Sequence, residues 1–189
     1  MKEFHAKIAS YLGRMKVFLV GYMGVGKTTV GKRLANALDL AFIDLDAYIE
    51  AAERRTISTI FEQEGESSFR GIERRSLREV AQMDKVLISC GGGTPCYYDN
   101  MRFMKEQGVT VYLQMDPLSI VYRLSHAKEE RPLVARLGPE ELMSFVKQHL
   151  SERAEYYEEA DVIFNALGLN ASKMDDLKAA VLKAQAQSR

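Results

Sequence analysis

The chain has 189 residues, of which 47% are hydrophobic and 28% charged, a balance that suits one globular domain with a sizeable core. Lys plus Arg and Asp plus Glu both number 26, so the formal net charge of +0 argues against a general nucleic-acid binder. No apolar run approaches the ~20 residues that cross a bilayer, and the N-terminus lacks the apolar core of a signal peptide. The two cysteines, Cys90 and Cys96, lack zinc or C-x-x-C spacing, which favours a reduced cytoplasmic protein. We expect it to bind neither nucleic acid nor membrane.

Short apolar runs alternate with helical patterns along the chain. The predicted strands are Val17–Val20, Ala41–Ile43, Val86–Ser89, Val109–Leu113 and Val162–Phe164. The predicted helices cover about 29–38, 46–64, 66–82, 97–107, 117–126, 139–159 and 172–187. This alternation predicts an α/β fold in which a parallel sheet is covered on both faces. Ligands of such sheets gather at the carboxyl ends of the strands, so the residues that follow each strand are the candidates for function.

A phosphate-binding loop follows the first strand. Gly21, Gly26, Lys27 and Thr28 complete the pattern G-x-x-x-x-G-K-[ST] between a strand and a helix. In this context backbone N–H groups and the helix N-terminus point at phosphates, Lys27 reaches the β/γ oxygens and Thr28 binds Mg²⁺. A Gly-rich turn without a ligand is the alternative, but strand, loop and helix all agree. The predicted ATP-binding residues of the loop are Gly24, Val25, Gly26, Lys27, Thr28 and Thr29.

Two carboxylates, Asp44 and Asp46, follow the second strand. Many P-loop enzymes carry an Asp after the third strand that helps to hold Mg²⁺, but Ser89-Cys90-Gly91 stands there. We expect Asp44 to supply that charge, directly or through a water. Asp46 is then available to orient the acceptor hydroxyl or take its proton. The alternative is that one of them caps the helix that begins near Ala47.

Two further motifs predict the acceptor site. Gly91–Gly93 follow the third strand, and three glycines make sense where a ligand lies directly on the backbone; a flexible turn is the alternative. Arg70 and Glu73 share a helix face, where the Glu can hold the Arg rigid enough to grip a carboxylate or phosphate. A solvated charged face is the alternative for this pair.

Two later arginines complete the candidates. Arg131 lies in the charged segment 127–133, which could close over the nucleotide as a lid and bring Arg131 to the transferring phosphoryl group. A mobile charged loop is the alternative. Arg153 lies on a predicted helix, where the residues alone give no reason to prefer it over Arg136 or Lys147.

Taken in order, these motifs resemble the shikimate kinase family. The family pattern of a phosphate loop, Asp-x-Asp, Phe-Arg-x-x-Glu, Gly-Gly-Gly, Arg-Pro-Leu and Arg-x-x-x-Tyr is matched by Gly21–Thr28, Asp44/Asp46, Phe69-Arg70/Glu73, Gly91–Gly93, Arg131-Pro132-Leu133 and Arg153/Tyr157. The resemblance implies a three-layer α/β/α P-loop kinase fold of the nucleoside-monophosphate-kinase type. It also implies a five-stranded parallel sheet in the order 2-3-1-4-5 and a mobile lid at about 126–137.

The resemblance implies transfer of the ATP γ-phosphoryl group to the 3-hydroxyl of shikimate, with Mg²⁺ as cofactor and a monomeric enzyme. The implied catalytic residues are Lys27, Asp46 and Arg131. The implied shikimate-binding residues are Asp46, Arg70, Gly92 and Arg153, supported by Glu73, Gly91 and Gly93. The implied metal ligands are Thr28 and Asp44, and Arg123 is the nearest candidate for stacking on adenine, although Leu124 or Ser125 is an alternative.

The segment before Met15 extends beyond the usual start of the family. Residues 1–15 are expected to be either a docked helix or sequence upstream of a natural start at Met15, and residues 16–189 to form one kinase domain. Alternatives for function are another small-molecule P-loop kinase, such as a gluconate or nucleotide kinase, and an inert nucleotide-responsive module that binds a partner.

Overall fold

A computed structural model describes residues 15–126 and 137–187 of the chain. Its strands are β1 (Lys16–Val20), β2 (Ala41–Asp44), β3 (Val86–Ser89), β4 (Val109–Gln114) and β5 (Val162–Asn165). Its helices are α2 (Lys27–Leu38), α3 (Leu45–Glu53), α4 (Ile57–Val80), α5 (Asn100–Gln107), α6 (Pro117–Ser125), α7 (Pro139–Glu158) and α8 (Ala171–Gln187), with the 3₁₀ turn η1 at Thr94–Cys96.

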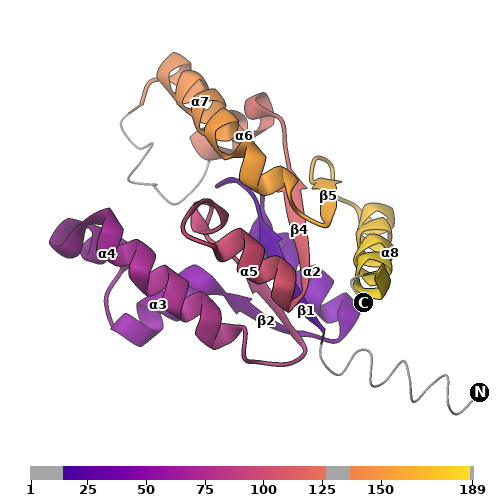
Figure 1. The fold of residues 1–189 in the computed structure, drawn as a ribbon. Coiled ribbons are helices and arrows are strands. Elements are labelled where there is room, and N and C mark those ends of the chain that lie inside the picture. The colour runs from indigo at the N-terminus through magenta and orange to yellow at the C-terminus, as the bar shows by residue number, and fades with distance from the viewer. Residues whose placement is uncertain (1–14, 127–136, 188–189) are drawn as a thin grey trace, which may run out of the picture.

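The five strands form one parallel sheet in the order β2-β3-β1-β4-β5, which confirms the expected topology. Figure 1 shows the helices arranged around this sheet, with α5 crossing in front of the central strands. Because all strands run the same way, their carboxyl ends meet at one edge. The register places Ser89 of β3 opposite both Asp44 of β2 and Leu19 of β1, so the loops after these three strands adjoin.

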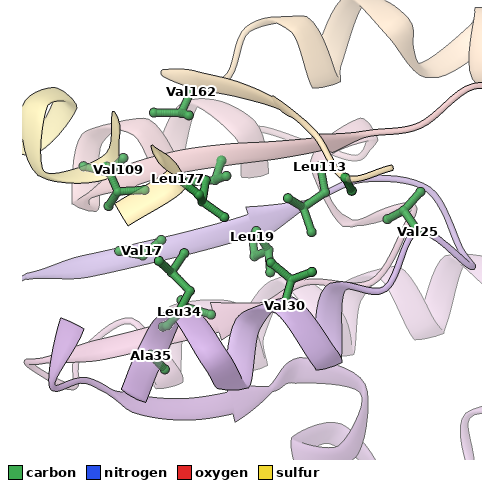
Figure 2. Packing of buried hydrophobic residues seen from close by; sticks show 14 of the residues in the cluster. Val17, Leu19, Val25, Val30, Leu34, Ala35, Val109, Leu113, Val162 and Leu177 are labelled. Atoms are coloured by element: carbon green, nitrogen blue, oxygen red, sulfur yellow. The ribbon is translucent and has the colours of Figure 1, made fainter. Parts of the chain in front are cut away.

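Side chains of the inner strands β1, β3 and β4 alternate between two buried layers, as a sheet covered on both faces requires. Val17 and Leu19 face the layer formed with α2 and α8, where Leu34 and Leu177 are fully buried (Figure 2). Phe18 of the same strand faces the opposite layer, formed with α3, α4 and α5. The two layers fix the sheet between the helices and hold its carboxyl edge in place.

The predicted helix over 46–64 is wrong, because the chain breaks between α3 and α4. Arg54 ends α3 in the left-handed conformation (φ 54°), and Thr56 starts α4 by accepting a hydrogen bond from the Thr59 N–H at 3.1 Å. The expected break near residue 65 is present as a kink inside α4, where Gly65 has φ 78°. The predicted helix over 97–107 begins only at Asn100, because Tyr98 has φ 55°.

Two segments for which the sequence predicts a structure lie outside the described residues. Residues 1–14 of the expected N-terminal extension and residues 127–136 of the expected lid, with Arg131, lie there. Met15 is described and is fully buried in the layer beneath α2 and α8, and its carbonyl accepts the Val86 N–H at 3.1 Å. No helix in the described ranges is long and apolar enough to cross a membrane.

Candidate active site

The phosphate loop joins β1 to α2 at the carboxyl edge of the sheet. Gly26 occupies the N-cap of α2 with φ 95°, a conformation that side chains rarely adopt. The Lys27 ammonium donates to the carbonyls of Gly21 at 2.8 Å and Tyr22 at 2.9 Å, so it lies across the loop. Loop and helix N-terminus together form a concave surface for an anion.

A cavity of about 340 Å³ lies over this loop. Its lining includes Gly24, Gly26, Lys27, Thr28, Thr29, Asp44, Asp46, Gly92 and Arg123. Val25, which the sequence analysis also predicted to bind ATP, has its side chain buried in the core and can offer the cavity only its backbone. The cavity thus contains most of the residues that were expected to bind the nucleotide.

Thr28 and Asp44 lie together at the floor of the nucleotide cavity. The Thr28 hydroxyl donates to Asp44 Oδ2 at 2.9 Å, while Asp44 Oδ1 accepts the Ala47 N–H at 3.4 Å as the N-cap of α3. Asp44 thus caps α3 and still lines the cavity. A hydroxyl and a carboxylate are hard oxygen donors that suit Mg²⁺, which keeps several waters and takes phosphate oxygens as its other ligands.

A second cavity, of about 220 Å³, adjoins the first. Its lining includes Asp46, Phe61, Arg70, Glu73, Gly91, Gly92, Gly93 and Arg153. Three residues line both cavities: Met23, Asp46 and Gly92. A carboxylate thus stands at the junction between a phosphate-binding cavity and a cavity lined by two arginines.

Each residue of the triple glycine lies against one of the side chains that were predicted to bind the acceptor. A Cβ at Gly91 would approach Asp46 Oδ1 to 2.9 Å, and a Cβ at Gly93 would approach Arg70 Nη2 to 2.7 Å. A Cβ at Gly92 would lie 3.6 Å from Arg153 Nη1. The glycines therefore leave room for these three side chains.

Arg70 and Glu73 form a buried ion pair beside the triple glycine. Arg70 Nη1 donates to Glu73 Oε2 at 2.9 Å, and the Thr94 hydroxyl donates to Glu73 Oε1 at 2.6 Å. The Glu73 side chain is only 1% exposed, so both of its oxygens need these partners. Burial opposes the charge of Arg70, but Glu73 and Glu66 outweigh burial and raise the pKa of the guanidinium.

Arg153 reaches the second cavity from α7, a helix far along the chain. Its guanidinium carbon lies 5.6 Å from the centre of the ring of Tyr22, a fully buried residue of the phosphate loop. Four residues further along α7, the Tyr157 hydroxyl donates to the Gly92 carbonyl at 2.6 Å. These contacts hold the α7 arginine over the triple glycine.

Arg123 of α6 lies against the phosphate loop. Its Nη1 donates to the carbonyls of Val25 at 3.1 Å and Gly24 at 3.4 Å. It lines the nucleotide cavity together with Leu124, one of the alternatives for the adenine contact. A stacking role on adenine stays a prediction for Arg123.

Four residues without a predicted role also contact side chains of the site: Thr94, Tyr22, Glu66 and Tyr97. Thr94 is fully buried. It directly follows the triple glycine, and this place after a strand end was a signal that the sequence offered. Glu66 lies four residues before Arg70 on α4, so helical spacing was a signal for that pair. Tyr22 and Tyr97 act through contacts between segments distant in sequence, such as Tyr97 Oη to Glu66 Oε1 at 2.7 Å across 31 residues. Sequence spacing gives no sign of the contacts that Tyr22 and Tyr97 make.

A phosphate loop that opens onto a separate arginine-lined cavity, on a parallel sheet in this order, defines a P-loop kinase of small molecules. A family model described as "Shikimate kinase" matches residues 23–182. The chain belongs to the shikimate kinase family.

Several relatives carry the same description. A shikimate kinase from Bacteroides thetaiotaomicron is 48% identical over 152 residues, covering 80% of this chain and 87% of that protein. One from Parabacteroides distasonis is 47% identical over 169 residues, covering 89% of this chain and 98% of that protein.

Solved structures show the same similarity. A crystal structure of shikimate kinase from B. thetaiotaomicron superposes with a TM-score of 0.82 at 43% identity, covering 92% of this chain and 97% of that one. A shikimate kinase from Acinetobacter baumannii in complex with shikimate has a TM-score of 0.77 at 31% identity, covering 95% of this chain and 97% of that one. A gluconokinase from Sinorhizobium meliloti, with a TM-score of 0.52 at 16% identity, shares the fold alone.

Proposed function

We propose that this chain transfers the γ-phosphoryl group of ATP to the 3-hydroxyl of shikimate, giving shikimate 3-phosphate and ADP. The observation that carries the proposal is the junction of the two cavities at Asp46 and Gly92. The phosphate loop lies on one side of this junction, and Arg70 and Arg153 lie on the other. The arrangement supports a small anionic acceptor whose hydroxyl meets a nucleotide phosphate.

The acceptor half of the site matches the chemistry of a carboxylated polyol. In the proposal, Arg70 and Arg153 bind the carboxylate, because a guanidinium offers paired N–H donors that fit two carboxylate oxygens. Asp46 accepts the hydroxyl proton, and the backbone of Gly92 lies under the ring. Glu73, Gly91 and Gly93 support these residues through the contacts described above.

The donor half of the site handles the charge of the phosphates. Lys27 binds the β/γ oxygens, and the loop N–H groups of Gly24–Thr29 cradle the phosphates. We assign Mg²⁺ to Thr28 and Asp44, where it would neutralise charge on the phosphate oxygens. Arg131, outside the described residues, is proposed to stabilise the transferring group from the lid, and Arg123 to meet the adenine.

At phosphorus the reaction forms one bond and breaks one, while a proton passes from the acceptor hydroxyl to Asp46. The acceptor oxygen attacks the γ-phosphorus, the bond from that phosphorus to the β–γ bridging oxygen breaks, and ADP leaves. Asp46 takes the proton of the attacking hydroxyl and later gives it to solvent. Positioning and charge stabilisation supply most of the acceleration in this class of reaction, because the phosphoryl transition state needs little covalent help.

We further propose that the enzyme acts as a cytoplasmic monomer on two small molecules and binds neither nucleic acid nor membrane. The balance of 26 basic and 26 acidic residues supports this, since a nucleic-acid or anionic-membrane surface would need excess positive charge. Light scattering during size-exclusion chromatography checks the oligomeric state.

A coupled ADP-release assay over a panel of acceptors tests the proposal. We expect ATP- and Mg²⁺-dependent turnover with shikimate, and none with gluconate or a nucleoside monophosphate. Turnover of gluconate or of a nucleoside monophosphate but not shikimate would establish one of the alternative kinases. ATP binding without turnover of any acceptor would indicate the inert nucleotide-responsive module.

A further inference from the structure

The guanidinium of Arg70 is held from two directions. On the inner side, Nη1 donates to the buried Glu73. On the outer side, Nε and Nη2 both donate to Oε1 of Glu66, at 3.2 and 3.0 Å. The Glu66 side chain is 51% exposed, so this second carboxylate lies at the surface end of the guanidinium.

Tyr97 completes the outer contact. Its hydroxyl donates to the same Glu66 oxygen at 2.7 Å, and the centre of its ring lies 4.0 Å from Arg70 Cζ. Tyr97 thus fixes Arg70 twice, through its ring and through the carboxylate. The hydrogen bond from Tyr97, followed by those from Arg70, lowers the pKa of Glu66, so the carboxylate is charged at neutral pH.

Glu66 and Tyr97 lie beside the second cavity, called here the acceptor cavity, but do not line it. Arg70 and Glu73 are among the residues that line the cavity, whereas Glu66 and Tyr97 are not. A guanidinium has five N–H donors, and the three described hydrogen bonds of Arg70 leave two of them for a ligand. Contacts from outside the cavity therefore orient the group without covering it.

We propose that Glu66 and Tyr97 are positioning residues that orient Arg70 before the acceptor arrives and thereby set the selectivity for a carboxylated acceptor. The inference rests on the proposed function, in which Arg70 binds the carboxylate of shikimate. A free arginine side chain loses rotamer entropy when it is fixed. Fixing it in the unliganded enzyme removes that cost from binding.

The charges near Arg70 decide which variant tests this best. Glu66 and Glu73 place two negative charges beside one guanidinium, so removing the Glu66 charge alone would also strengthen attraction for any anion. Tyr97→Phe keeps both charges and the ring, and removes only the hydroxyl. It therefore changes positioning without changing the charge at neutral pH.

The experiment compares an acceptor that has the carboxylate with one in which it is blocked. KM for shikimate and the inhibition constant of shikimate methyl ester are measured for the wild type and Tyr97→Phe. Loss of one hydrogen bond of about 1 kcal/mol predicts a roughly fivefold rise in KM for shikimate. The inhibition constant of the ester, kcat and the KM for ATP should change less than about twofold.

Tyr98→Phe is the matched control, because the neighbouring ring lies 5.1 Å from Arg74 Cζ and is 58% exposed. It should leave both constants unchanged. In an Arg70→Lys background, Tyr97→Phe should have no further effect on KM, because the group that it orients has been replaced.

Glu66→Asp provides an independent variant, since it keeps the charge but shortens the reach to Arg70. It should raise KM for shikimate in the same selective way, whereas Glu64→Asp, at a carboxylate paired with Arg55, should not. An unchanged KM in Tyr97→Phe and Glu66→Asp, or an equal rise for shikimate and the ester, would overturn the inference. Failure of the proposed function is distinguishable, because the wild type itself would then not phosphorylate shikimate.

Discussion

Tyr157 of α7 donates its hydroxyl to the carbonyl of Gly92 at 2.6 Å, which joins two segments that are 65 residues apart. The ring of Tyr157 is fully buried and stacks on Tyr112 of β4 with a centroid distance of 4.9 Å. Because Arg153 lies one turn earlier on the same helix, this bond fixes the distance between Arg153 and the triple glycine.

Tyr157→Phe should remove the hydrogen bond to Gly92 while keeping the buried ring in place. Loss of the hydrogen bond costs about 1 kcal/mol and should lower Tm by roughly 2–4 °C. We also expect a rise in KM for shikimate, because Arg153 is no longer held over Gly92, with little change in KM for ATP. Thermal unfolding and steady-state kinetics check both effects, and an unchanged KM would restrict Tyr157 to a structural role.

Asp46→Asn should lower kcat far more than it weakens ATP binding. The carboxylate stands where the two cavities meet, and a general base of this kind contributes about 10²–10⁴ in rate. Steady-state kinetics measure the loss in kcat, and nucleotide titration measures the affinity for ATP. An equal loss of both would contradict the assignment of Asp46 to proton transfer.

Gly93→Ala should move Arg70 while leaving the fold intact. The new Cβ would lie 2.7 Å from Nη2, and a side-chain end can shift where backbone cannot. We expect a severalfold rise in KM for shikimate and a small change in Tm. Gly71→Ala is the control, because nothing lies within 4 Å of its Cβ and Ala favours the α4 helix by about 0.5–1 kcal/mol.

His149 predicts how stability depends on pH. Burial, and then the charge of Arg153, lower the pKa of His149, against a smaller opposing effect of Glu152. The Tyr22 hydroxyl lies 3.4 Å from its Nδ1, and the Phe145 ring packs on it at 4.0 Å. The folded protein therefore binds a proton less readily than the unfolded chain, whose His titrates near 6.5.

It follows that stability is fully present above about pH 6.5 and falls as the pH drops through the lowered pKa of His149. Tm measured between pH 7.5 and 5.5 should decrease less in His149→Gln than in the wild type. This window lies above the range where carboxylates titrate. Parallel Tm curves for the two proteins would show that His149 is not the group responsible.

Much of the fold followed from local sequence, and what did not follow has a physical cause. The strands were visible because buried parallel strands are short continuous apolar runs, and the phosphate loop because its glycines, lysine and threonine have fixed spacing. The strand order came from the resemblance to a family, whereas the expected lid lies outside the described residues. The break at Arg54 was missed because an arginine in the left-handed conformation has no signature in the sequence.

The same division holds for the site. Asp44, Asp46 and Gly91–Gly93 were found because the carboxyl ends of parallel strands meet at one edge. The positions of Arg153 over Tyr22, and of Tyr97 on Glu66, depend on how helices dock, which spacing along the chain does not encode. Thr94 follows the end of β3, so the same reasoning about strand ends could have found it. Its hydrogen bond to Glu73 is visible only in the folded structure.

The two hydrogen bonds that Lys27 makes to the carbonyls of Gly21 and Tyr22 have a consequence for nucleotide exchange. The ammonium group that is proposed to meet the phosphates bridges the loop from within in the structure described here. In the proposal, the phosphate oxygens of ATP would compete with these two carbonyls for the N–H donors of the ammonium. Lys27→Ala would therefore remove two hydrogen bonds within the loop as well as a positive charge beside the phosphates.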